Sequence, residues 1–154
     1  MIQNINMAHI TLLFVFVLLI TFPTIISHAD DGMFTEPVAH VSVDTNTMTP
    51  LQLKLIFTLS VPRWTDGSRV VVVVYPADHV NQKTFLKEYF GMNSFRFEEL
   101  INSKINTGRA NPPIVVETER DMIRTVKGQP GSIGFTKSHV VIRGEYGIKR
   151  IKVN

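Results

Sequence analysis

The chain has 154 residues, of which 44% are hydrophobic and 19% are charged, and its formal net charge is +3. This length and composition fit one globular domain with an extension. The chain contains no cysteine, which excludes disulfides, thiol catalysis, cysteine-ligated metal and a lipid-modified cysteine. Basic residues are scattered among acidic ones and form no run, so the sequence does not indicate nucleic-acid binding.

The N-terminal extension has the pattern of a signal peptide. Residues 10–26 are almost entirely apolar, and Ser27 and Ala29 have the small side chains and the spacing of a signal-peptidase site. We therefore expect a signal peptide at 1–29, a polar linker at 30–37, and an exported, periplasmic domain over 38–154. Residues 1–9 lack the usual basic side chains, which leaves an uncleaved membrane anchor as the alternative.

The domain opens with a predicted strand at 38–43 and a predicted helix after it. Thr49 as N-cap, Pro50 at the first helical position and Gln52 completing a capping box mark the helix start. Apolar residues at helical spacing predict the face that covers a sheet, namely Leu51, Leu55, Ile56 and Leu59.

Five consecutive valines at 70–74 predict a strand that is buried on both faces, because the run shows no alternation. Such a strand is typical of the middle of a mainly parallel sheet covered by helices. A right-handed crossover from the strand at 38–43 predicts that the two strands are parallel and end at the same edge.

The rest of the chain continues the alternation of helices and strands. Its predicted elements are a helix at 81–90 stopped by Gly91, a helix capped by Ser94, a short buried strand at 114–116, a helix from Thr118 to Gly128, a strand at 132–136 and, after a turn at 144–147, a final strand at 148–153. The sequence thus predicts a single α/β lobe. An all-β fold is the alternative, and the helical spacing after Thr49 and Thr118 argues against it.

The loop after the valine strand is the first candidate site, because ligands in such sheets collect beyond the carboxyl ends of the strands. Asn81 and Gln82 could donate hydrogen bonds to a small oxyanion, and His79 and Lys83 could supply positive charge at a helix N-terminus. The alternative is structural: Asp78 or Asn81 caps the helix, and the remaining residues form a solvated loop.

A second polar segment completes the predicted site. Thr45 and Asn46 would line the same concavity if the first two strands were parallel; otherwise they form an ordinary polar turn. The histidines are too dispersed to indicate a metal site, and no nucleophile with an adjacent base can be recognised. We therefore expect neither an enzyme nor a cofactor.

Three spaced segments resemble one protein family. They are residues 49–57 (TPLQLKLIF) with 64–67 (WTDG), a strand–loop–helix ending at Phe85, and residues 129–135 (QPGSIGF). Together they resemble the phosphate-binding proteins of bacterial phosphate ABC transporters, in the type 2 periplasmic-binding-protein superfamily. In that family two α/β lobes close on the anion, and this chain resembles one lobe alone.

The resemblance implies a binding protein but not the family's phosphate contacts. The family's anion loop reads R-x-D-G-S-G-T, and the corresponding residues 75–81 read YPADHVN, so the arginine, serine, glycine and threonine that contact phosphate are missing. One hypothesis is an exported solute-binding protein that holds phosphate or another small oxyanion. The other is a ligand-free periplasmic partner of a transporter, sensor or envelope complex, and a homodimer fits either hypothesis.

Overall fold

A computed structural model describes residues 34–137 and 147–154 of the chain. The predicted signal peptide, the start of the predicted linker and the turn at Gly144 lie outside the described residues. The chain divides into two units, Met1–Asp31 and Gly32–Asn154, and the elements below belong to the second.

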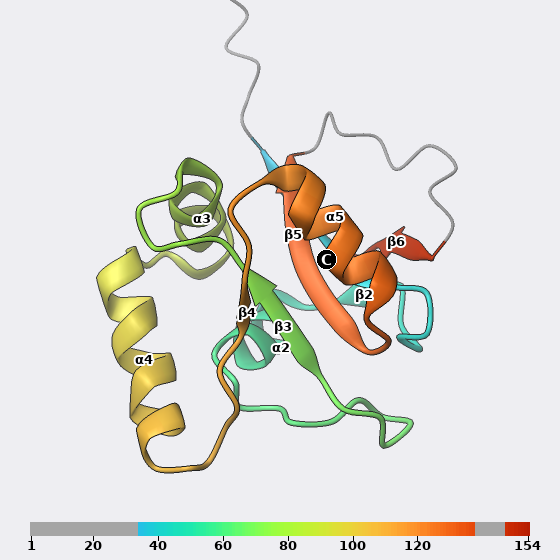
Figure 1. Ribbon diagram of the computed structural model, residues 1–154, viewed down its shortest axis with the longest axis horizontal. Coiled ribbons are helices and arrows are strands. Elements are labelled where there is room, and N and C mark those ends of the chain that lie inside the picture. The colour runs from blue at the N-terminus through green and yellow to red at the C-terminus, as the bar shows by residue number, and fades with distance from the viewer. Residues whose placement is uncertain (1–33, 138–146) are drawn as a thin grey trace, which may run out of the picture. The chain divides into compact units, whose positions relative to one another are not determined.

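A five-stranded sheet, in the order β4-β3-β5-β1-β6, forms the centre of this unit (Figure 1). Its strands are β1 (Thr35–His40), β3 (Val71–Val74), β4 (Ile114–Val115), β5 (Ser132–Lys137) and β6 (Ile148–Arg150). A separate parallel pair consists of β2 (Thr47–Met48) and β7 (Lys152–Val153). The valine strand β3 lies inside the sheet between β4 and β5, as predicted.

The strand directions confirm a mainly parallel sheet. β3 is parallel to both β4 and β5, whereas β1 is antiparallel to β5 and to β6. Four strands therefore run in one direction and β1 alone runs in the other. Together with the helices described below, this confirms the predicted α/β lobe and excludes the all-β alternative.

The predicted pairing of the first strand with the valine strand is wrong. β5 lies between β1 and β3, and β1 runs opposite to both. The right-handed crossover rule gives the hand of a connection between parallel strands, but it does not establish that two successive strands are parallel. Their carboxyl ends consequently lie at opposite edges of the sheet.

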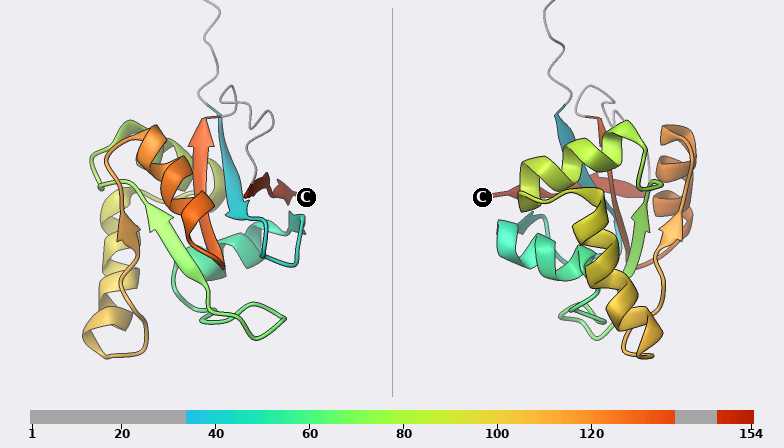
Figure 2. Two further views of the ribbon diagram at one scale, coloured as in Figure 1. Left: turned by 45° about the vertical axis from the view of Figure 1, so that its right-hand side comes forward. Right: turned by 90° about the vertical axis from the view of Figure 1, so that its left-hand side faces the viewer.

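Helices cover both faces of the sheet (Figure 2). They are α2 (Pro50–Phe57), α3 (Val80–Phe85) with the π-helical turn η1 (Leu86–Phe90), α4 (Ser94–Asn106) and α5 (Glu119–Gly128). α5 packs on one face, and the other helices lie on the opposite side (Figure 2). None of the helices in the described ranges is long and apolar enough to cross a membrane.

An aromatic cluster fills the side of the sheet that carries α2 and α3. The rings of Phe85 and Phe135 stack with centroids 4.0 Å apart, and Phe57 and Phe90 pack around them. On the other face, β5 presents Gly134 to α5. A Cβ at this glycine would lie 2.4 Å from the sulfur of Met122, so any larger residue would displace the buried Met122 side chain.

Helix α2 has the predicted start but a different buried face. Thr49 and Gln52 form the expected capping box. The buried residues of α2 are Leu53, Ile56 and Phe57, whereas Leu51 and Leu55 are exposed. Both sets recur at helical spacing, and the set containing the large Phe57 ring, which joins the aromatic cluster, is the one that packs on the sheet.

Three further details of the elements differ from the prediction. β1 begins at Thr35, so part of the predicted linker belongs to the sheet. Asn93, not Ser94, caps α4, because the Asn93 side chain accepts the hydrogen bond from the backbone N–H of Arg96. β4 is an edge strand with exposed side chains, and only Val116 after it is buried.

Candidate functional site

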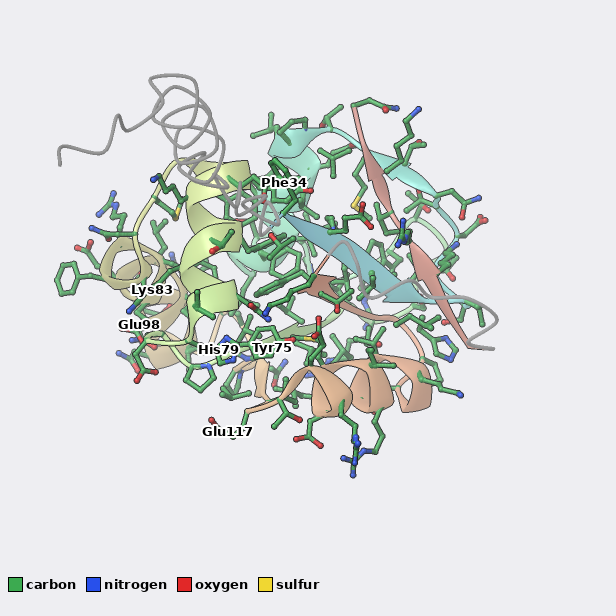
Figure 3. All side chains as sticks on the ribbon, turned by 90° about the horizontal axis from the view of Figure 1, so that it is seen from above. Phe34, Tyr75, His79, Lys83, Glu98 and Glu117 are labelled. Atoms are coloured by element: carbon green, nitrogen blue, oxygen red, sulfur yellow. The ribbon has the colours of Figure 1, made fainter. Side chains whose placement is uncertain are left out.

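The candidate site lies at the carboxyl-end edge of the sheet, defined here as the ends of β3, β4 and β5 with the residues that follow β3 and β4 and the starts of α3 and α5. Figure 3 looks onto this edge and shows Tyr75 and His79 beside each other. Their rings stack with centroids 4.3 Å apart and planes 10° from parallel. The chain therefore turns from β3 into α3 against a stacked pair of rings.

His79 caps α3, which corrects the prediction that Asp78 or Asn81 does so. The ring Nδ1 of His79 accepts a hydrogen bond from the backbone N–H of Asn81 at 3.1 Å. Nδ1 therefore serves as an acceptor for the backbone within the lobe. Asp78 is exposed beside it.

Asn81 and Gln82, which were predicted as donors to a ligand, are buried. Their exposed fractions are 3% and 2%. The side-chain Oε1 of Gln82 accepts a hydrogen bond from the backbone N–H of Tyr75 at 3.2 Å. Gln82 thus ties the first turn of α3 to the end of β3, because that N–H has no strand partner beyond Val74.

Two polar atoms at this edge are buried without a hydrogen bond of normal geometry, the hydroxyl of Tyr75 and the Oδ1 of Asn81. Burial raises the pKa of Tyr75 to about 12; the neighbouring Asn81 amide lowers it, and the charge of Glu119 raises it further. The Glu119 carboxylate accepts hydrogen bonds from the Thr136 hydroxyl and, at 2.8 Å, from the backbone N–H of Lys137. This fixed negative charge opposes an anion at the same edge.

The other predicted site residues lie elsewhere. Thr45 and Asn46 follow the carboxyl end of β1 and are therefore at the opposite edge of the sheet from α3. The Thr45 hydroxyl donates to the carbonyl oxygen of Thr47, and the Asn46 carbonyl accepts from the backbone N–H of Lys152. Thr45 lines a separate cavity of about 220 Å³ beside Trp64. This segment is thus an ordinary polar turn, which was the alternative prediction.

Lys83 does not join His79 in one charged site. It is exposed on α3 and borders a hollow of about 580 Å³ between α3 and the start of α4, together with Lys87 and Phe95. Figure 3 shows Lys83 and Glu98 on this side of the molecule. The predicted site residues around the start of α3 are therefore divided: Asn81 and Gln82 are buried, whereas Asp78 and Lys83 are exposed.

Sequence reasoning missed the apolar side chains that the carboxyl-end edge exposes. Val80 at the start of α3 is 48% exposed, and Val115 at the end of β4 is 56% exposed. It also missed Tyr75 and Glu119. Tyr75 could have been found as the residue directly after the valine run, whereas nothing in the sequence distinguishes Glu119 from any acidic residue in the first turn of a helix.

The described residues hold no group of three histidine, aspartate or glutamate side chains that could bind a metal ion. No protein-family model matches the chain, and neither does any curated protein.

Solved structures, in contrast, match the fold. An ABC-type phosphate transport receptor from Vibrio cholerae aligns at 17% identity with a TM-score of 0.59, covering 77% of this chain and 45% of that one. PstS from Borrelia burgdorferi aligns at 14% identity with a TM-score of 0.58, covering 78% and 47%. A putative phosphate ABC transporter substrate-binding protein with bound phosphate from Clostridium perfringens aligns at 16% identity with a TM-score of 0.52, covering 77% and 44%.

The chain has the fold of these phosphate-binding proteins. It spans less than half of the length of each. The resemblance predicted from the sequence is thereby confirmed at the level of the fold, and the partial coverage is consistent with a short relative.

Proposed function

We propose that this chain works as an exported, periplasmic lobe of the solute-binding fold whose carboxyl-end edge contacts a partner protein of the cell envelope. One observation carries the proposal. At this edge His79 and Gln82 use their polar atoms for contacts within the lobe, while Val80 and Val115 are exposed. Exposed apolar side chains beside polar groups that are turned inward favour contact with another protein.

The fold gives this edge a further reason to be covered. In the family that the sequence resembles, two α/β lobes close on the anion. This chain aligns with less than half of each solved phosphate-binding protein. A partner protein, such as a transporter subunit, a membrane sensor or a second copy of the chain, would cover Val80 and Val115 at this edge.

Site-specific photocrosslinking tests the proposal. A benzophenone amino acid is placed at Val80, at Val115 or at Leu51 in the full chain, and adducts formed in living cells are identified by mass spectrometry. Leu51 is the matched control, because it is apolar and 64% exposed but lies on α2. We expect one envelope protein, or the chain itself, to be captured from positions 80 and 115 and not from position 51. Equal capture from position 51, or none from the other two, contradicts the proposal.

A second candidate function is the binding of phosphate or another small oxyanion at the same edge. The fold shared with proteins named for phosphate transport favours it. Glu119 and the internal contacts of His79 and Gln82 oppose it. We therefore expect a phosphate Kd on the order of millimolar in titration calorimetry. A micromolar Kd for the monomer would favour this second function over the first.

A further inference from the structure

The opposite edge of the sheet contains a cavity that the proposed function does not use. It lies at the amino ends of β3 and β5 and has a volume of about 300 Å³. Its lining comes from the segment between α2 and β3, the first half of β3, the connection from α4 to β4, and Gln129 before β5. Figure 1 shows these two connecting segments at the lower end of the sheet.

The sequence explains why the cavity exists. β4 pairs only with Val73 and Val74, so the preceding residues, from Val70 to Val72, have no strand beside them on this side. Pro112 and Pro113 directly precede β4 and lack the N–H groups that a longer ladder would need. The connection therefore bends away from β3 and leaves an opening.

Two arginines line this cavity, Arg69 before β3 and Arg109 after α4. Within residues 34–137 and 147–154 neither guanidinium has an ion pair or a hydrogen bond, and no acidic side chain lines the cavity. Arg96 and Arg124, in contrast, each pair with a carboxylate on their own helix. Uncompensated guanidinium groups at one opening favour an anion with two coplanar oxygens.

The remaining walls are mostly apolar. They include Leu59, Val61, Pro62, Val70, Pro113 and Ile114. Cavities of this size with apolar walls and a few charged groups are typical of sites for small organic molecules. Inorganic phosphate could use the arginines but not these walls.

We propose that this cavity binds a small organic carboxylate with an apolar tail. The carboxylate meets Arg69 and Arg109, and the tail lies against the apolar side chains between α2 and β4. The site is at the edge opposite to the proposed partner surface, so it stands or falls independently of the proposed function.

Hexanoate is a suitable probe, with hexanamide as its uncharged counterpart and inorganic phosphate as an anion without a tail. Calorimetric titrations use the protein expressed as the full chain. We expect hexanoate to bind with a Kd on the order of 0.1 mM. We expect hexanamide and phosphate to bind at least about tenfold more weakly, since one lacks the charge and the other lacks the tail. Equal affinity for either compound, or no saturable binding of hexanoate, overturns the proposal.

Substitution of the arginines locates the site. Arg69→Gln and Arg109→Gln should each weaken hexanoate binding about tenfold, which corresponds to one charge-assisted hydrogen-bonded contact. Both residues are exposed, so circular dichroism should show an unchanged fold. Arg124→Gln on α5 is the matched control and should leave the Kd unchanged. Unchanged affinity in both cavity variants, or an equal loss in the control, overturns the assignment.

Discussion

The two edges of the central sheet use their polar side chains in opposite ways. At the carboxyl-end edge, His79 caps a helix, Gln82 accepts from the end of β3, and Glu119 accepts from the end of β5. At the amino-end edge, Arg69 and Arg109 line a cavity without a partner among the described residues. In this fold, therefore, the edge where ligands usually collect is not the edge that has free groups to bind them.

The connections at the two edges account for this difference. Only five residues separate the end of β3 from the start of α3, so the polar side chains there must satisfy the free N–H groups of the strand end and the helix start. The connection from α4 to β4 contains two prolines and pairs with little of β3. Arg69 and Arg109 beside it make no side-chain hydrogen bond within the described residues.

Among the substitutions that test this comparison, one at Gln82 should have the largest effect on the free energy of unfolding. Gln82→Ala leaves the backbone N–H of Tyr75 buried without an acceptor and opens space beneath α3. We expect the free energy of unfolding to fall by about 2–3 kcal/mol, measured by urea denaturation. If Gln82 were a ligand-binding residue and not a structural one, the loss would be far smaller.

Lys83→Ala is the control for Gln82→Ala, because Lys83 is the next residue of the same helix but is exposed. Its effect should stay within about 0.5 kcal/mol. Equal losses in the two variants would show that the effect is a general property of α3 and not of the hydrogen bond to β3.

His79 should have the next largest effect. His79→Ala removes the acceptor for the N–H of Asn81 and the ring stacked on Tyr75, and we expect a loss of about 1 kcal/mol in the free energy of unfolding. His79→Asn restores an N-cap acceptor and should recover most of this loss. Failure of the asparagine variant to recover stability would indicate that the stacked rings, and not the cap, fix the start of α3.

Much of the fold could be predicted because its signals are local. The valine run, the capping box at Thr49 and the helix from Thr118 to Gly128 depend on neighbouring residues, and each has its predicted place in the structure. The direction of β1 could not be predicted, because it depends on β5, which lies almost a hundred residues later in the chain and occupies the position beside β3.

The candidate site was less predictable for a similar reason. The sequence indicates a polar loop and helix start at 78–83, which the structure has, but it cannot indicate which side chains turn inward. The burial of Asn81 and Gln82 follows from packing between α3 and β3. The cavity at Arg69 and Arg109 joins segments that are forty residues apart, and no short motif marks it.

The smallest effect should come from Tyr75, whose hydroxyl is buried without a hydrogen bond of normal geometry. Tyr75→Phe removes this group and keeps the ring that stacks on His79, so the stability near neutral pH should stay the same or rise by up to about 1 kcal/mol. A clear loss of stability would show that the hydroxyl makes a hydrogen bond that matters, with Asn81 as its nearest candidate.

Alkaline pH sharpens the same test. Burial raises the pKa of Tyr75 from 10.0 to about 12, so between these two values the unfolded chain has lost the phenol proton while the folded chain still holds it. The contribution of Tyr75 to stability is therefore fully present below pH 10 and is lost as the pH rises toward 12. Burial raises the pKa of Tyr89 to about 12 as well, so the wild type should lose stability through both tyrosines. The free energy of unfolding of Tyr75→Phe, measured by urea denaturation across this range, should fall less steeply with pH than that of the wild type. An identical slope for the two proteins would show that the Tyr75 hydroxyl reaches solvent.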